Sequence, residues 1–464
     1  MLEFLDLALA EASKLGAEFA DVRTVSDVST SIVVEDGVAS KAVSSVESGL
    51  GVRVLVEGCW GYASTTTPTR RAVEEAVRDA FSMAKALSKR GGEKVELSKV
   101  ITHKASFEVK PRIDPIDVSM EEKVDRCVEL EKAARTFDSR VVSTRLGFID
   151  LVRDELVANT FGAEVESRVV YTRANIVVVA FEAGVRQRAS ERVGKTAGYE
   201  VFKNLETDVF SVEAAKRALA LLKAGTPPAG RFTAILDQRM TGLFTHEAFG
   251  HAAEADAVLA GASILAGMVG KQVASKLVTI VDDPTIEGAF GHIKYDSEGV
   301  EAKRKVLVEN GVLKGYMHTL ETSSRMGVAP NGSGRAQDYR FRPIVRMSNT
   351  FIEPGGQTFE EMVEDLRQGV YMKGSTYGHV EPATGNFLYK AEEGYLVEKG
   401  EKTKLLRDVS LSGNIFELLG AVDAVGNDFT LGSPGFCGKW GQSVPVDDGG
   451  PHIRVREVLV GGAQ

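Results

Sequence analysis

The residues of this chain best suited to do chemistry are His246, Glu247 and His251, in the segment HEAFGH. The zinc-protease signature HExxH places its two histidines one helical turn apart, whereas here one extra residue separates them. Five residues advance a regular helix by about 500°, which leaves the second histidine about 140° from the first. The two side chains can share a metal only if the helix is deformed. Gly250 stands just before His251, and it predicts a π-bulge at that point.

This combination of side chains is typical of a hydrolytic zinc (Zn²⁺) site. Two neutral imidazoles hold zinc at about 2.0–2.1 Å, and with a third protein ligand one position stays open for water. Zinc lowers the pKa of that water towards about 7. A neighbouring carboxylate, here Glu247, can accept the proton of the water and pass it to the leaving amine.

The alternative interpretation is a helix that carries two surface histidines. Only 7 histidines occur in 464 residues and two of them flank an acidic residue here, which favours the metal. The other five histidines are isolated, and we interpret each as a solvated or core residue: His103, His292, His318, His379 and His452.

Two residues compete for the place of third ligand. Cys437 stands in a glycine-rich segment, GSPGFCGKWG, where a tight turn can project its sulfur towards a site, and nearby Lys439 would favour a thiolate. Glu254 is the other candidate, because a carboxylate soon after the histidines often completes a zinc site. If Cys437 binds the metal, Glu254 is expected to orient a histidine instead. Cys59 and Cys127 are interpreted as structural.

The sequence gives little support for other kinds of catalysis or ligand binding. The sequence contains no GxGxxG, GxxxxGK[ST] or GxSxG motif, which argues against a nucleotide-binding protein or a serine hydrolase. Paired acidic residues occur at 281–284 and 295–303, and we interpret them as solvated turns without a chemical role.

The elements that must position the site follow from the hydrophobic periodicity. Residues 3–15 predict a helix, and strands joined by a hairpin turn at Asp36-Gly37 follow, before a helix from Thr67-Pro68 to about residue 87. A second block repeats this order: Ser119 begins a helix, four or more strands follow, and a helix over 212–223 ends the block.

A linker at 224–230 separates these blocks from the rest of the chain. Beyond it we predict a strand, then the helix with the two histidines, and then mainly strands with glycine turns. The predicted fold is α+β. An N-terminal α/β domain of helices and antiparallel hairpins covers 1–225, with a further division at 1–112 and 113–225. A C-terminal domain, 226–464, carries the metal-site helix on a barrel-like antiparallel sheet.

Composition limits the function classes. The net charge is −9, which gives no electrostatic reason to bind nucleic acid or an anionic membrane. The 3 cysteines form no CxxC pair and indicate a reducing compartment. The acidic, amphipathic N-terminus does not resemble a signal peptide. The uncharged segment 257–270 is shorter than the ~20 residues that span a bilayer. We therefore expect a cytoplasmic protein.

The motifs taken together resemble the TldD/PmbA family, and in particular its TldD branch. The resemblance rests on HEAFGHAAEAD, KLVTIVDDPT, YDSEGVEAKR, ENGVLKGYM, PIVRMSNTFIEPG, ATGNF, GFCGKWGQSVPVDDGGPHIRV and LVGG, which cover nearly all of 231–464 in order. The sequence departs from many relatives at Ala252, where they have glycine, and between residues 335 and 342.

This resemblance implies a zinc metallopeptidase that degrades small unfolded peptides, with His246, His251 and Cys437 as zinc ligands and Glu247 as the catalytic base. It also implies a dimer, either a homodimer or a heterodimer with a PmbA-like subunit that lacks the metal motif. Two alternatives stay open: a non-catalytic metal-binding or scaffold subunit of such a complex, and a protein in which zinc only stabilises the fold. A fourth protein ligand, such as Glu254, would favour the structural site.

Overall fold

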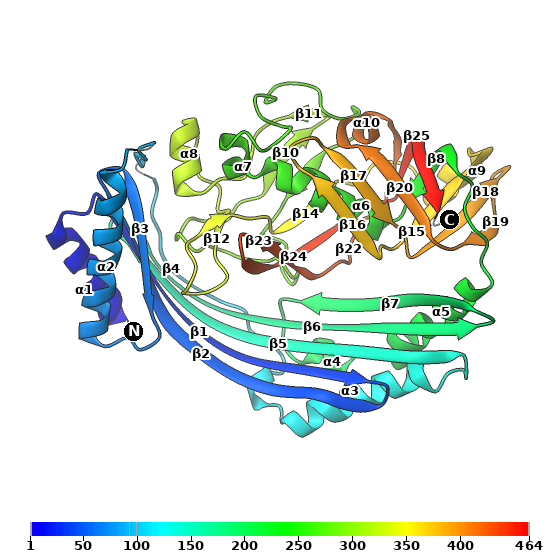
Figure 1. Ribbon diagram of the computed structural model, residues 1–464, viewed down its shortest axis with the longest axis horizontal. Coiled ribbons are helices and arrows are strands. Elements are labelled where there is room, and N and C mark those ends of the chain that lie inside the picture. The colour runs from blue at the N-terminus through cyan, green and yellow to red at the C-terminus, as the bar shows by residue number, and fades with distance from the viewer. Residues whose placement is uncertain (1, 92, 99, 463–464) are drawn as a thin grey trace.

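The computed structural model describes residues 2–91, 93–98 and 100–462. A long curled sheet from the N-terminal half forms a half-barrel, and the C-terminal half lies on its concave side (Figure 1). Helices and strands alternate irregularly along the chain, so the predicted α+β class is confirmed. Among the described residues no helix is both long enough and apolar enough to cross a membrane.

The N-terminal sheet has seven strands in the order β3-β2-β1-β5-β6-β4, with β7 paired to β6. All pairs are antiparallel except β4 with β6. The predicted hairpin at Asp36-Gly37 joins the first two strands, and both residues have the positive φ that such a turn requires. The strands are β1 (Phe19–Glu35), β2 (Val38–Val56), β3 (Cys59–Thr65), β4 (Lys104–Glu108), β5 (Val141–Asn159), β6 (Glu164–Glu182) and β7 (Val185–Lys195).

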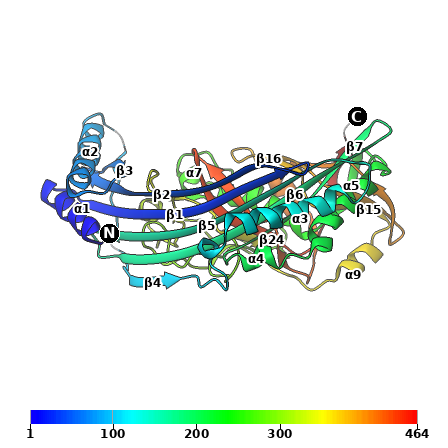
Figure 2. The same cartoon turned by 90° about the horizontal axis from the view of Figure 1, so that it is seen from below.

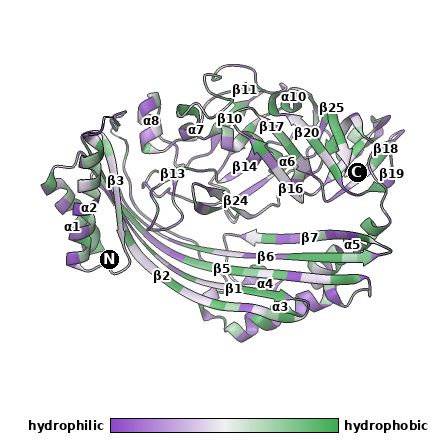
Figure 3. Cartoon of the chain, in the orientation of Figure 1, coloured by the Kyte–Doolittle hydropathy of each residue, from purple (hydrophilic) through white to green (hydrophobic). Residues whose placement is uncertain are grey.

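Helices pack on the convex face of this sheet (Figure 2). They are α1 (Leu2–Leu15) and α2 (Arg70–Ser88) near one end, and α3 (Met120–Arg135), α4 (Glu200–Lys203) and α5 (Glu213–Leu222) near the other, with short turns η1 (Pro115–Asp117) and η2 (Asp208–Val212). Ser119 begins α3 as predicted, because its hydroxyl accepts the backbone N–H of Glu122. Buried and less buried residues alternate along strands such as β5, and Figure 3 shows the matching change of hydropathy.

The two predicted N-terminal blocks share this one sheet. β1 from the first block pairs along its length with β5 from the second, from Asp21–Asn159 to Glu35–Arg145. The boundaries at residues 112 and 225 remain predictions.

The C-terminal half contains two large sheets. One has nine strands in the order β16-β17-β20-β25-β8-β15-β18-β19, with β21 paired to β25, and the other has seven in the order β11-β10-β9-β14-β24-β22, with β23 paired to β24. Most pairs are antiparallel, as predicted, but β8–β15 and β14–β24 are parallel. The strands are β8 (Gly230–Leu236), β9 (Ile280–Asp282), β10 (Lys305–Glu309), β11 (Val312–Leu313), β12 (Gly334–Arg335), β13 (Ile344–Val345), β14 (Asn349–Ile352), β15 (Gln368–Lys373), β16 (Tyr377–Glu381), β17 (Asn386–Lys390), β18 (Glu393–Glu398), β19 (Glu401–Leu406), β20 (Val409–Asn414), β21 (Val422–Val425), β22 (Thr430–Leu431), β23 (Gly435–Lys439), β24 (Gln442–Gly450) and β25 (Ile453–Gly462).

The largest hydrophobic core lies where these sheets meet the helix that follows β8. That helix runs without a break through α6 (Gln238–Phe244), η3 (Thr245–Gly250) and η4 (His251–Ala253), and it is followed by α7 (Ala255–Leu259). Phe244, Ala248 and Phe249 of this helix are fully buried, so its histidines have a rigid base. The remaining helices are α8 (Leu320–Met326), α9 (Phe359–Glu364) and α10 (Ile415–Gly420).

The interpretation of the acidic segments at 281–284 and 295–303 as solvated turns was wrong. Asp282 is fully buried, where it pairs with Lys305 at 2.8 Å and accepts hydrogen bonds from residues of β14 and its approach. Glu298 is also fully buried and pairs at 2.7 Å with Arg53 of β2, which also binds Asp21. These carboxylates hold distant segments together because each meets a buried partner that is remote in sequence.

Candidate metal centre

The two histidines lie where the helix changes its hydrogen-bond register. Asp237 starts the helix by accepting the backbone N–H of Met240 at 2.8 Å. From Thr245 to Gly250 the helix is a π-helix, and the N–H of His251 donates to the carbonyl of His246, five residues back. The predicted π-bulge is therefore confirmed. The wider turn brings both imidazoles to one side, with ring centroids 5.4 Å apart.

Close packing explains why glycine precedes the second histidine. A Cβ atom on Gly250 would lie 2.0 Å from the sulfur of Met347, and one on Gly242 would lie 2.5 Å from the backbone nitrogen of Gly449. A larger residue at Gly242 would have to move the backbone, and one at Gly250 would have to displace the buried side chain of Met347. The helix is therefore pressed against the segment before β14 and against β24 along the length that carries the histidines.

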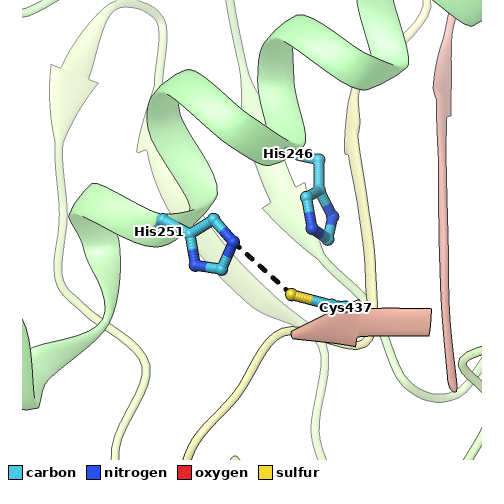
Figure 4. Close-up of side chains that lie close together, drawn as sticks. All are labelled: His246, His251 and Cys437. Atoms are coloured by element: carbon cyan, nitrogen blue, oxygen red, sulfur yellow. Dashed lines mark hydrogen bonds between the residues drawn. The ribbon is translucent and has the colours of Figure 1, made fainter. Parts of the chain in front are cut away.

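Cys437 approaches the histidines from the opposite side, on the hairpin of β23 and β24. Figure 4 shows the two imidazoles and the thiol converging, and their candidate ligand atoms all lie within 4.8 Å of one another. Sγ of Cys437 is 3.4 Å from Nε2 of His251. Arg346, fully buried, donates a hydrogen bond to the carbonyl of Cys437 and so holds the hairpin in place.

The pKa values of these three side chains differ strongly from their usual values. Burial acts to raise the pKa of the Cys437 thiol, but the adjacent His246 and His251 lower it to about 5. Burial acts to lower the pKa of His246, but the thiolate raises it to about 9, and Glu254 with Cys437 keeps the pKa of His251 well above its usual value. A thiolate with two imidazoles is the donor set that zinc prefers, and three protein ligands leave a fourth position open. The residues therefore fit a zinc ion.

Glu254 is not grouped with these three residues. Its buried carboxylate accepts a hydrogen bond from Nδ1 of His251 at 2.9 Å, on the side of the ring that faces away from Cys437. The ammonium group of Lys439 contacts Glu254 at 3.1 Å and Asp256 at 2.7 Å, and it also donates to the carbonyl of Val345. Of the two candidate third ligands, the structure brings Cys437 to both histidines and places Glu254 behind one of them.

Glu247 lies beside the cluster and stays accessible. Its side chain is 37% exposed, and Oε2 is 3.9 Å from Nε2 of His251. It is likewise not grouped with the three candidate ligands. A carboxylate in this place can meet a water molecule at the open position.

The remaining histidines and cysteines lie elsewhere. His292 and His318 are buried, and His452 is bonded to Asp428, while burial raises the pKa of Cys127 to about 12, as expected of an inert core thiol. Sequence reasoning did not single out Asp448, whose buried Oδ1 lies against the metal-site helix at Gly242. Its segment was part of the family resemblance, but no spacing linked it to the histidines.

Comparisons with known proteins identify the family of the chain. The profile of the PmbA/TldA metallopeptidase C-terminal domain matches residues 229–462, the central domain matches 113–222, and domain 1 matches 20–84. A metalloprotease of Methanothermobacter thermautotrophicus is 41% identical over 96% of both chains. A zinc metalloprotease TldD homolog of Saccharolobus solfataricus is 30% identical over 98% of this chain and 99% of its own.

Solved structures share the fold. TldE from Thermococcus kodakarensis superposes with a TM-score of 0.79 at 20% identity, covering 99% of this chain and 100% of its own. At that identity the likeness shows the fold alone. The profile matches and the relatives together span both halves, and the chain therefore belongs to the PmbA/TldD metallopeptidase family.

Proposed function

We propose that this protein is a zinc-dependent metallopeptidase that hydrolyses small or unfolded peptides. The observation that carries the proposal is the convergence of His246, His251 and Cys437 within 4.8 Å, with the exposed carboxylate of Glu247 beside them. These three residues would hold the zinc ion. When bound, zinc supplies Lewis acidity, which acidifies a water molecule and polarises the scissile carbonyl.

Glu247 performs the proton transfers in this proposal. Its carboxylate accepts a proton from the attacking water and then donates it to the nitrogen of the leaving amine, so that the amine departs neutral. Its position supports this role, because it is close to His251 and open to solvent at the same time. Glu254 has a different part, since its bond to Nδ1 of His251 leaves Nε2 directed at the cluster.

The neighbouring sheet edge supports an extended substrate. In the pairing of the described strands, β16 pairs only with β17 and so ends the nine-stranded sheet. It lies against the metal-site helix, since a Cβ on Gly378 of β16 would be 3.0 Å from the side chain of Leu243. A free strand edge can bind an extended chain through main-chain hydrogen bonds, which depend little on side chains. Unfolded peptides meet that requirement, and stably folded proteins do not.

The two alternative functions, a scaffold subunit and a protein with a structural zinc ion, would require other features of the metal site. A scaffold subunit has no need of Glu247 next to an intact donor set. A structural zinc site normally has four protein ligands, but the carboxylate considered as a fourth ligand, Glu254, is engaged by His251 and Lys439. Both observations favour catalysis.

The experiment is elemental analysis of the purified protein together with cleavage of an unstructured peptide. We expect about one zinc per chain and cleavage that a chelator abolishes and zinc restores. We also propose a dimer, either of two copies of this chain or with a PmbA-like subunit, so the assay is run with this protein alone and with a PmbA-type chain added. Stoichiometric zinc without cleavage in either condition would support the scaffold or structural alternative, and absence of zinc would refute the metal site itself.

A further inference from the structure

Four buried polar atoms without a hydrogen-bond partner belong to the metal-site helix or to residues packed against it. Among the described residues, the buried side-chain atoms that lack a partner include Nδ1 of His246, Oδ1 of Asp448, the hydroxyl of Tyr389 and Oγ1 of Thr241. Buried polar atoms in proteins nearly always have a partner. Such atoms on and around the helix that carries a candidate metal ligand therefore call for a functional explanation.

Asp448 and the ring of His246 occupy the same stretch of the helix surface. A Cβ atom on Gly242 would lie 2.5 Å from Oδ1 of Asp448, so that the carboxylate sits directly over this glycine. His246 follows Gly242 by four residues, and helical side chains lean back over the residue one turn before them. Because Gly242 has no side chain, the Asp448 carboxylate can occupy the part of the helix surface towards which the His246 imidazole leans.

Charge interactions agree with this placement. Burial raises the pKa of Asp448 to about 7, and the charge of His246 is the largest of the influences that lower it, ahead of Arg192 and a hydrogen bond with Ser433. Burial raises the pKa of Tyr389 far above its usual value, and the charges of Glu247 and Asp448 raise it further. Among the ion pairs of the described residues none includes Asp448, and the charge of Arg192 acts on this carboxylate less than that of His246 does.

The chemistry of a metal-bound histidine indicates what Asp448 does. The two nitrogens of an imidazole point in different directions, so when Nε2 binds a metal, Nδ1 keeps a proton that needs an acceptor. For His251 that acceptor is Glu254, at 2.9 Å. His246 has no such partner in the structure, although its Nδ1 is buried.

We propose that Asp448 is the positioning residue of His246: it accepts the Nδ1 proton, directly or through one water, and the hydroxyl of Tyr389 donates to the same carboxylate. The inference rests on the proposed zinc site and deepens it. Each histidine then has its own carboxylate, Glu254 for His251 and Asp448 for His246. Asp448 forms no ion pair with a lysine or arginine of the described residues, so its charge acts chiefly on the imidazole and raises the basicity of His246 as a ligand.

The test compares zinc affinity in four proteins: wild type, Asp448→Ala, Asp448→Asn and the control Asp447→Asn. The dissociation constant is measured by competition with a chromophoric chelator. Loss of a carboxylate bonded to a metal-bound histidine weakens metal affinity by about 10- to 100-fold, and we expect this of Asp448→Ala. Asp448→Asn, which keeps an acceptor and the volume, should recover part of the loss. Asp447 accepts backbone N–H groups of Phe290, Ser433 and Asp448, so its variant should stay within about twofold.

Two further readouts separate positioning from a structural role. Removing a buried carboxylate that forms no ion pair should leave the unfolding temperature of the metal-free protein unchanged or higher, whereas a structural role would lower it. In cobalt-substituted protein, the exchangeable Nδ1 protons of the two bound histidines should give two shifted proton NMR signals. Asp448→Asn should lose or broaden one through faster exchange with water, and Glu254→Gln the other.

The outcomes are distinguishable. A zinc affinity of Asp448→Ala within twofold of wild type overturns the inference, as does an equal loss in Asp447→Asn. Weaker binding with both exchangeable signals intact also overturns it, because Asp448 would then act elsewhere than on His246. If the wild-type protein binds no zinc, the proposed function fails before any variant is compared.

Discussion

Glu247→Gln separates metal binding from catalysis. The substitution keeps the shape of the side chain but removes a group that can accept a proton. Because Glu247 is not among the three converging residues and its side chain is 37% exposed, the variant should bind zinc normally. Exposed substitutions usually change the free energy of unfolding by no more than about 0.5 kcal/mol, so its unfolding temperature should also stay near that of wild type.

The magnitude follows from the role. General-base catalysis contributes roughly 10²–10⁴-fold, which is about 2.7–5.4 kcal/mol of barrier at 1.36 kcal/mol per tenfold. The loss should appear in kcat, because the carboxylate acts on the water and not on the bound peptide. KM should change little, and the variant should retain bound peptide.

The assay combines zinc content, thermal unfolding and steady-state cleavage of an unstructured fluorogenic peptide. The matched variant is Glu254→Gln, whose carboxylate is bonded to His251 at 2.9 Å. It should show the reverse pattern, with zinc affinity weaker by about 10- to 100-fold. If Glu247→Gln loses zinc as completely as a His246→Ala protein, Glu247 is a ligand or an essential support, and the base must be sought elsewhere.

Further predictions concern the ligands, the thiol and the joint between the two halves. His246→Ala and His251→Ala should each abolish stoichiometric zinc and cleavage yet leave the circular dichroism spectrum unchanged; zinc retained in both variants would refute the site. Cys437→Ser should weaken zinc strongly, because a neutral hydroxyl is a poorer ligand than a thiolate, while Cys127→Ser should not, and equal effects would contradict the assignment. In the metal-free protein the pKa of Cys437 is lowered to about 5, so thiolate absorbance near 240 nm that is missing from Cys437→Ser should persist as the pH falls to about 5 and disappear below it; a transition near the usual pKa of about 8.5 would be contrary evidence. Arg53→Leu leaves two buried carboxylates unpaired, so the free energy of unfolding by urea should fall by about 3–5 kcal/mol, and a change below about 1 kcal/mol would show that the ion pairs to Asp21 and Glu298 are not needed.

Local features of the site could be predicted from the sequence. The spacing of His246 and His251 on a helix requires an extra residue in one turn, and the structure has a π-helix there. The hairpin at Asp36-Gly37 and the start of α3 at Ser119 also depend on neighbouring residues only. Such features are set by backbone geometry within about one turn, and that information is contiguous in the chain.

The partners of these local elements were decided by the tertiary structure. The residues alone left Cys437 and Glu254 as rival third ligands, and only the docking of the β23–β24 hairpin brings Cys437 to 3.4 Å from His251, 186 residues away. Acidic segments that look like solvated turns are buried, because Asp282 and Glu298 meet Lys305 and an arginine of the N-terminal sheet.

Asp448 is the clearest example of a residue whose place is decided by the tertiary structure alone. Nothing in its sequence neighbourhood indicates that it reaches the helix of His246, because that depends on β24 packing against a bare glycine backbone at Gly242. Residue types and short spacings determine which chemistry is available to a chain. Which groups share one desolvated space is decided by long-range packing, since burial and distance, not order along the chain, set the strength of charge interactions and hydrogen bonds.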